Sequence, residues 1–315
     1  MNTPYFLLSK EEVIAKHDFA KALCDELSYS LKTNPEVGKV LEENTACSFS
    51  IHSIEGMGGI KDASRVWMFA QGWSSDDIVL YHERGIRRFV VDNEADLDVL
   101  VGCLDMFDDS SVGLLLRMRM KENTVNTGKY FVYGMYSSQI NRLVPILKKN
   151  PKLRTLGLHF HRKSQNTSEW SLRYELEQSI EQSVLPMIDA INIGGGLPSK
   201  YRNSKADVIS GIAEKIGEFR EWLSSNQIKL IIEPGRFIAA PAVRLVTSIR
   251  LVYDGNIIVD SSVYNTFIDT FVANLKLQIK DELSEADYKE GKARMYAIKG
   301  NTPCSMDLYR YRVFL

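Results

Sequence analysis

"QIKLIIEPGR", residues 227–236, places an isoleucine-rich apolar run directly before a polar turn that contains proline and glycine. The preceding segment, 205–226, has helical character. A short apolar run that ends at proline and glycine is typical of a buried strand, and parallel strands are usually joined by helices. Repetition of this unit along the chain would make the protein an α/β fold.

The unit does recur. Eight apolar or β-branched runs are predicted as strands: 27–34, 47–53, 77–82, 88–93, 112–120, 156–162, 189–195 and 229–235. Segments of helical character separate most of them: 35–44, 93–107, 137–150, 168–185 and 205–226. Eight such units within the first 240 residues or so match the size of a (β/α)8 barrel, in which chemistry sits at the C-terminal ends of the strands. A doubly wound open sheet is the structural alternative.

The alternation of predicted strands and helices ends after Arg236. Residues 242–264 form two β-rich runs around an Asp-Gly turn, 281–294 form a polar helical stretch, and 294–300 are a further strand candidate. We therefore predict a boundary near residue 240, with a barrel in 1–240 and a β-rich domain in 241–315.

Composition narrows the function. The 39 basic and 40 acidic residues give a net charge of -1, which predicts no nucleic-acid or membrane partner and favours a small-molecule substrate. No CxxC pair occurs among Cys24, Cys47, Cys103 and Cys304, which argues against a zinc knuckle or disulfide framework. No signal peptide or apolar run of about 18 residues is present, so a cytoplasmic location is expected.

Chemically useful residues fall at the predicted strand ends: Lys32, His161, Ser164, Gly194, Gly195, Gly196, Glu233 and Arg236. A lysine can form a Schiff base with an aldehyde, and a glycine-rich turn and an arginine can bind phosphate. His159 and His161 share one face of a strand and could be a metal pair, but no third ligand is evident, so no metal site is predicted.

Four ordered motifs carry a family resemblance: "SYSLKTNP" (28–35), "GLHFHRKSQ" (157–165), "INIGGGLP" (191–198) and "IIEPGRFI" (231–238). Their order and spacing resemble the fold-type III pyridoxal-phosphate decarboxylases, the ornithine and diaminopimelate decarboxylase family. The resemblance implies a (β/α)8 barrel of alanine racemase type followed by a partial C-terminal β domain. It also implies pyridoxal phosphate as cofactor, an amino acid as substrate, and a homodimer with shared active sites.

The resemblance assigns a role to each motif. Lys32 would hold the cofactor as a Schiff base, and His161 would lie against its ring. The phosphate would be bound by Ser164, Gly194, Gly195, Gly196 and Arg236.

Glu233 would lie beside the pyridine nitrogen and favour its protonated form, the electron sink that decarboxylation needs. Related racemases have an arginine there, so Glu233 disfavours a racemase. A racemase or epimerase, and a non-catalytic homologue that binds a partner protein, remain the alternatives.

Two departures from the family pattern lie in the barrel. Lys163 stands where the family's "HxGS" motif has glycine, so the loop must differ locally. Ser50 stands where many relatives carry an aspartate near the cofactor, so one acidic contact is expected to be absent.

A third departure lies in "GNTPCSMD", which resembles the family's "GPxCDSxD" segment. Aligned without gaps, Pro303 takes the cysteine's place; a shift by one restores Cys304 and puts Ser305 at the acid position. The missing acid favours a less cationic or scaffold-tethered amino acid over ornithine or lysine, as in siderophore or antibiotic biosynthesis. Cys304 is predicted to be catalytic, and the predicted substrate contacts are Tyr264, Ser305 and Asp307. Because the chain stops soon after Asp307, we also expect a fused or missing C-terminal segment.

Overall fold

The computed structural model describes residues 2–107, 111–120, 133–204 and 208–315. By their contacts these residues form two compact units, one of 10–198 and 208–240 and the other of 2–9, 199–204 and 241–315. Whether 1–240 and 241–315 fold as separate domains stays a prediction.

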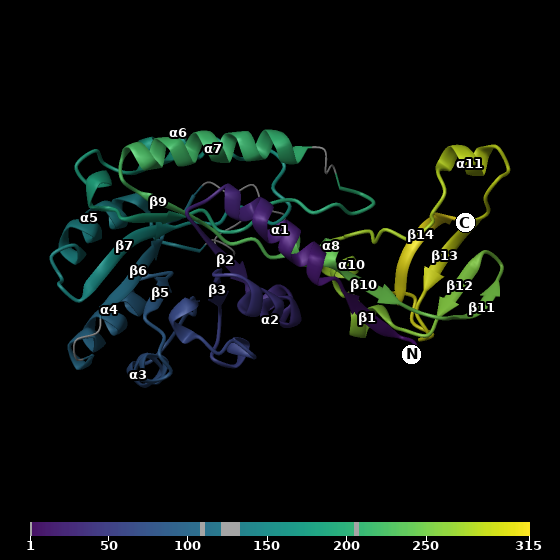
Figure 1. The fold of residues 1–315 in the computed structure, drawn as a ribbon, viewed down its shortest axis with the longest axis horizontal. Helices are drawn as coiled ribbons and strands as arrows, with labels where there is room; N and C mark the ends of the chain where they lie inside the picture. Colours follow the sequence, from purple (N-terminus) through teal and green to yellow (C-terminus); the bar gives the residue numbers. More distant parts are fainter. Residues whose placement is uncertain (1, 108–110, 121–132, 205–207) are drawn as a thin grey trace. The chain divides into compact units, whose positions relative to one another are not determined.

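The first unit is a closed barrel of eight parallel strands (Figure 1). The strands follow chain order around the barrel: β2 Glu26–Ser30, β3 Ser48–Ile51, β4 Val66–Met68, β5 Arg88–Val91, β6 Val112–Arg117, β7 Leu153–His159, β8 Ala190–Asn192 and β9 Lys229–Ile232. The barrel closes where Glu26 pairs with Ile231 and Leu27 with Ile232. The predicted (β/α)8 architecture is confirmed, and this closure rules out the open sheet.

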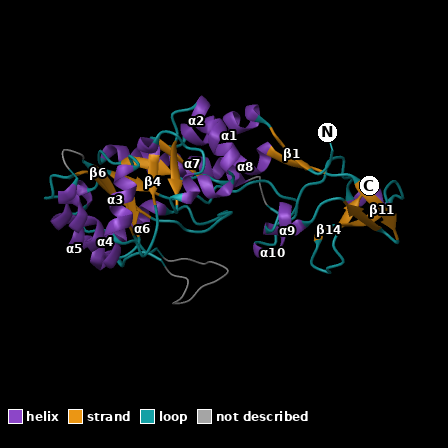
Figure 2. Cartoon of the chain, turned by 90° about the horizontal axis from the view of Figure 1, so that it is seen from below, coloured by secondary structure: helices purple, strands orange, loops and turns teal. Residues whose placement is uncertain are grey.

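Helices cover the strands (Figure 2). They are α1 Lys10–Ala22, α2 Pro35–Asn44, α3 Ser75–Glu83, α4 Glu94–Cys103, α5 Ser137–Leu147, α6 Leu172–Ser179, α7 Ile209–Ser225 and α8 Arg236–Ala242. Only short 3-10 turns, η2 Glu55–Met57 and η3 Ala63–Arg65, join β3 to β4. No helix in the described part of the chain is long and apolar enough to cross a bilayer.

One predicted strand is wrong. Residues 77–82 lie in α3, and the third strand of the barrel is β4, which was not predicted. Ser74 caps the helix by accepting a hydrogen bond from the Asp77 amide, while the Asp77 side chain accepts one from the Ser74 amide. This capping box fixes a helix start, and the buried Ile78 and Tyr81 lie three residues apart, as on one helix face.

The barrel interior holds a cluster of buried residues from β4, β5, β6, β8 and β9: Trp67, Val90, Leu115, Ala190 and Ile231, with Phe69 packed against it. Gly157 of β7 lets β8 approach closely, because a Cβ there would meet the Ala190 carbonyl and would lie 2.6 Å from Leu115 Cδ2. A filled interior leaves only the barrel ends for ligands.

The second unit is β-rich, as predicted. Its two-stranded ladder pairs β1 Tyr5–Leu8 antiparallel with β10 Val243–Val246. Its four-stranded mixed sheet has the order β11 Ile249–Tyr253, β12 Asn256–Val259, β13 Met295–Lys299 and β14 Leu308–Phe314. Three short helices complete it: α9 Val263–Thr266, α10 Asp269–Val272 and α11 Glu285–Lys289. The Asp-Gly turn joins β11 to β12, and the sheet packs around Ile257, Val259, Val263, Ile298, Tyr309 and Val313.

Candidate active site at the C-terminal ends of the barrel strands

Each barrel strand brings a polar or aromatic side chain to the same end of the barrel. From β2 to β9 these residues at or just past the strand ends are Lys32, His52, Phe69, Asp92, Arg117, His159, Asn192 and Glu233. Because the strands are parallel, their C-terminal ends form one rim, which is where barrel enzymes carry their chemistry.

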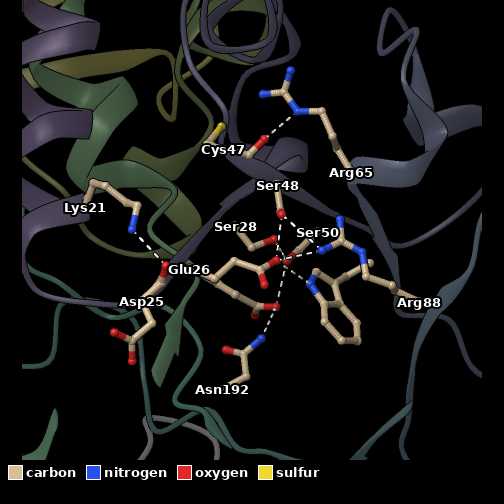
Figure 3. A network of polar contacts seen from close by, with 12 residues as sticks. Lys21, Asp25, Glu26, Ser28, Cys47, Ser48, Ser50, Arg65, Arg88 and Asn192 are labelled. Atoms are coloured by element: carbon tan, nitrogen blue, oxygen red, sulfur yellow. Dashed lines mark hydrogen bonds and ion pairs between the residues drawn. The ribbon is translucent and has the colours of Figure 1, made fainter. Parts of the chain in front are cut away.

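Glu233 lies at the centre of a hydrogen-bonded group that we name the Glu233 network: Glu233, Ser50, Asn192 and His159. Glu233 Oε1 accepts hydrogen bonds from Ser50 Oγ at 2.6 Å and Asn192 Nδ2 at 2.9 Å. Glu233 Oε2 lies 3.2 Å from His159 Nε2. Figure 3 shows Ser28, Ser50 and Asn192 converging inside the barrel, and the Ser28 and Ser50 hydroxyls are 2.7 Å apart.

The network keeps the carboxyl of Glu233 ionised. Burial alone would raise its pKa, but the charge of His159 and the hydrogen bonds from His159, Ser50 and Asn192 together lower the pKa to about 2. Hydrogen bonds to the charged form favour that form. At neutral pH the rim therefore contains a buried, fixed anion.

Ser50, noted as a departure from the family, contacts this anion directly. Its hydroxyl donates to Glu233, which a carboxylate at the same position could not do. An aspartate here would put two negative charges at hydrogen-bonding distance, and like charges this close disfavour ionisation of both. The serine thus supports an ionised Glu233.

Lys32 lies in the 3-10 turn η1 Leu31–Thr33, directly after β2, and its Nζ is 3.3 Å from His52 Nε2. Burial lowers the pKa of Lys32, Glu233 offsets part of this effect, and Arg117 and Arg236 lower the pKa further. A lowered pKa increases the fraction of the amine that is neutral, and the neutral amine is the nucleophilic form.

The two histidines of "LHFHRKS" have different neighbours. His159, which is buried, contacts Glu233. His161 lies against the loop formed by Gly194, Gly195 and Gly196, which we name the glycine loop. Burial, helped by the nearby charges of His159 and Arg117, lowers the pKa of His161 to about 4, so its ring is neutral. Within the described ranges, no group of three or more His, Cys, Asp or Glu side chains could hold a metal ion.

The glycine loop needs its glycines. Gly194 and Gly196 have φ of +66° and +106°, in the region that disfavours side chains. A Cβ on Gly194 would lie 2.9 Å from His161 Nδ1, and one on Gly195 would lie 2.7 Å from the Glu233 carbonyl oxygen. The loop backbone therefore makes a side-chain-free cradle between His161 and Glu233.

The loop that carries Lys163 has its own supports. Lys163 Nζ lies 2.6 Å from Glu169 Oε1, and the Asn166 amide donates to the Gly196 carbonyl at 2.8 Å. Arg162 pairs with Glu175. The side chain that replaces the family's glycine thus forms an ion pair with Glu169, while Ser164 is exposed in the same loop.

Arg236 begins α8, after the Glu-Pro-Gly turn that follows β9. A Cβ on Gly235 would meet Thr33 Oγ1, so this turn packs closely against the turn that carries Lys32. The structure therefore brings together, at one rim, the predicted Lys32, His161, glycine loop, Glu233 and Arg236.

The remaining predicted residues lie in the second unit. Tyr264 Oη is 2.9 Å from Cys304 Sγ, and this hydrogen bond lowers the pKa of the exposed Cys304 thiol. Asp307 is buried, and its carboxylate accepts hydrogen bonds from the Val263 amide and from the amide and hydroxyl of Thr302. Asp307 therefore holds a loop together, and Ser305 is exposed. Substrate or catalytic roles for Tyr264, Cys304, Ser305 and Asp307 stay predictions.

Sequence reasoning missed several rim residues. It gave no role to His52 or Asn192, nor to the pair of Arg117 and Asp92, whose side chains lie 2.8 Å apart. A signal was available, because each of the four is at or just past the end of a barrel strand.

The comparisons with known proteins agree with this architecture. Residues 11–240 match the family described as "Pyridoxal-dependent decarboxylase, pyridoxal binding domain". A curated relative, "Probable diaminopimelate decarboxylase, chloroplastic" from Oryza sativa subsp. japonica, is 27% identical over 265 residues, which cover 76% of this chain and 52% of the relative. The chain therefore spans about half the length of that relative.

Solved structures share the fold. A lysine/ornithine decarboxylase from Vibrio vulnificus, complexed with putrescine, superposes with a TM-score of 0.76 at 24% identity, over 99% of this chain and 84% of that one. A diaminopimelate decarboxylase from M. jannaschi gives a TM-score of 0.80 at 17% identity, over 100% and 79% of the two chains.

At these identities the structural matches establish the fold, whereas the family match covers most of the chain. It confirms the predicted family and its cofactor, pyridoxal phosphate. The chain belongs to the pyridoxal-dependent decarboxylases, and residues 11–240 are its pyridoxal binding domain.

Proposed function

We propose that the protein decarboxylates an amino acid with pyridoxal phosphate, which Lys32 would hold covalently through its amine. The observation that carries the proposal is the ionised Glu233, fixed at the barrel rim by Ser50, Asn192 and His159. A fixed anion stabilises a proton on a nearby ring nitrogen.

The rim residues fit the cofactor by their chemistry. An amine suits an aldehyde, a carboxylate suits a pyridinium nitrogen, and a side-chain-free backbone cradle with a nearby arginine suits a phosphate. In this assignment Glu233 would meet the nitrogen and His161 the ring. The phosphate would be held by Ser164, Gly194, Gly195, Gly196 and Arg236.

When bound, pyridoxal phosphate supplies the electron sink for the pair released as the carboxylate leaves as CO2. Glu233 would keep a proton on the ring nitrogen, because its own pKa is too low to take that proton. Once the substrate's amine had displaced Lys32 from the cofactor, the freed Nζ could carry a proton and deliver it to the carbon that loses CO2. His161 is neutral, so it would pack against the ring without adding charge.

For the substrate we propose an amino acid with a weakly cationic or scaffold-tethered side chain, as in antibiotic or siderophore biosynthesis. Support comes from "PCSMD", where no acid occupies the family's position and Asp307 is already hydrogen-bonded. Contacts to this substrate would come from Cys304, Tyr264, Ser305 and Asp307. We further propose a cytoplasmic homodimer with shared active sites.

Two measurements test the function. Pyridoxal phosphate is added, the adduct is reduced with borohydride, and the peptide that gains the cofactor's mass is identified; it should contain Lys32, and Lys32→Ala should gain none. CO2 release is then measured across a panel of amino acids. Cofactor attached elsewhere would refute the role of Lys32, and silence across the panel would favour the partner-binding alternative.

A further inference from the structure

His52 has no role in the function proposed above, yet its side chain is the hydrogen-bond partner of Lys32. It follows the last residue of β3, and its Nε2 lies 3.3 Å from Lys32 Nζ. Side chains alternate along a strand, so His52 faces the same way as Ser50, which contacts Glu233. Two successive inward positions of β3 thus contact the two residues on which the proposed chemistry depends.

The surroundings of His52 fix its ring and keep it neutral. The ring centroid lies 5.6 Å from that of Phe69, at 31°. Burial and the nearby charge of Lys32 lower the pKa of His52 to about 4, with smaller contributions from Glu233, which raises it, and from His159 and Arg117, which lower it.

A neutral imidazole has one donor and one acceptor nitrogen. Since Lys32 is a donor, Nε2 is the acceptor and the ring proton is on Nδ1. Nδ1 is buried, and no hydrogen-bond partner for it exists among the residues that the structure describes. Burying an unpaired donor costs free energy, so packing alone does not explain a histidine here.

We propose that His52 is a positioning residue for Lys32: its neutral imidazole accepts a hydrogen bond from Lys32 Nζ at Nε2 and fixes the direction of the amine. The inference rests on the proposed role of Lys32 as the cofactor's anchor. A hydrogen bond to the ammonium favours the charged form. His52 therefore opposes the effect of burial and lets Lys32 keep the proton that it delivers.

The test follows Lys32 alone in the cofactor-free protein. The rate at which an amine-reactive reagent labels Lys32 is measured against pH by peptide mass spectrometry. His52→Leu removes the acceptor and should move the midpoint to lower pH by about one unit, a tenfold change in the protonation equilibrium. His52→Gln retains an acceptor of similar reach and should restore most of the wild-type midpoint. His82→Leu, at a histidine stacked on Phe107 in the barrel's outer layer, is the matched control and should leave the midpoint unchanged.

An unchanged midpoint in His52→Leu, or equal shifts in His52→Leu and His52→Gln, would overturn the proposal. If the leucine variant does not fold, His52→Asn replaces it, since its amide is too short to reach Lys32 and should give the same shift. The borohydride experiment on the wild-type protein judges the anchor separately. Cofactor that does not attach to Lys32 would refute the proposed function, while the labelling midpoints would still decide the role of His52.

Discussion

Two carboxylates of the barrel, the half-buried Glu26 and the buried Glu233, are held in different ways. Glu26, the first residue of β2, accepts hydrogen bonds from Ser48 Oγ at 2.6 Å and Trp67 Nε1 at 2.9 Å, and it pairs with Arg88 at 2.7 Å (Figure 3). The Arg88 guanidinium also lies over the Trp67 ring, 4.9 Å from its centroid. We name these four residues the Glu26 network.

Glu233 lies at the opposite ends of the strands. Ser50 and Asn192 donate hydrogen bonds to its carboxylate. Among the described residues, its ion-pair partner is His159 rather than an arginine. An arginine is permanently charged and neutralises Glu26 fully. The difference shows how the partners decide what a carboxylate does: Arg88 compensates the charge of Glu26, which supports the fold, whereas a histidine, a serine and an amide keep Glu233 ionised and available to a ligand.

The largest expected effect comes from removing the charge at the rim. Glu233→Gln should lower the decarboxylation rate by a factor on the order of 10² to 10⁴, because the ring nitrogen loses the anion that keeps it protonated. The turnover number is measured with saturating cofactor. A variant with wild-type turnover would contradict the proposed role of Glu233, and far-ultraviolet circular dichroism checks that the variant is folded.

At the other end, loss of the carboxylate should affect stability and leave chemistry intact. Glu26→Ala leaves Arg88, Trp67 and Ser48 without their acceptor, which should cost about 2 to 3 kcal/mol in the free energy of unfolding. Urea unfolding measures the loss, and turnover of the folded fraction should match the wild type. A large loss of turnover would mean that the two ends are not separate in function.

Acid should weaken the fold through Glu233. Its pKa is lowered from 4.5 to about 2, so its contribution to stability is fully present above about pH 4.5 and is lost as the pH falls toward 2. Between pH 5 and pH 3 the loss should be about 2 kcal/mol by linkage. Urea unfolding of the wild type and Glu233→Gln at both pH values measures it. Equal losses in the two proteins would show that Glu233 is not the group responsible.

The smallest effects come from two matched serines. Ser50→Ala removes one donor to Glu233 and should raise the pKa of that carboxyl by about one unit, lowering activity most at acidic pH. Ser48→Ala removes one donor to Glu26 and should cost about 1 kcal/mol of stability with an unchanged activity profile. The pH dependence of turnover and urea unfolding separate them. Identical behaviour of the two variants would remove the distinction between the networks.

Much of the barrel can be predicted from the sequence, because the pattern of apolar residues within each segment indicates whether it forms a strand or a helix. The helices 35–44 and 137–150 were predicted from pattern alone and lie at α2 and α5. The third barrel strand, β4, does not stand out in the sequence because it has only three residues and follows a loop without an α-helix. The prediction places this strand at the next apolar run, 77–82, although the capping box at Ser74 indicates a helix there.

Some residues of the candidate site can likewise be predicted from the sequence, and others cannot. Lys32, Glu233 and the glycine loop belong to continuous motifs, so their residue types and spacing indicate their chemistry. The contacts of Glu233 with Ser50 and Asn192 depend on the register of β3, β2, β9 and β8, which brings residues 50 and 233 together from opposite ends of the barrel sequence. No local pattern records that register. The sequence does not indicate the role of His52 for the same reason, because its partner Lys32 lies just past the end of the neighbouring strand, β2.

The hydrogen bond between the hydroxyls of Ser28 and Ser50 has a defined donor and acceptor. A hydroxyl has one proton, so when Ser50 donates to the ionised Glu233, the bond between the serines must run from Ser28 to Ser50. If Glu233 takes up a proton, both hydroxyls can rotate, and the hydrogen bonds can then run in the opposite direction, from Glu233 to Ser50 and from Ser50 to Ser28. A carboxylate at position 50 could not reverse in this manner. The two serines therefore let the barrel accommodate either charge state of Glu233 without moving a heavy atom.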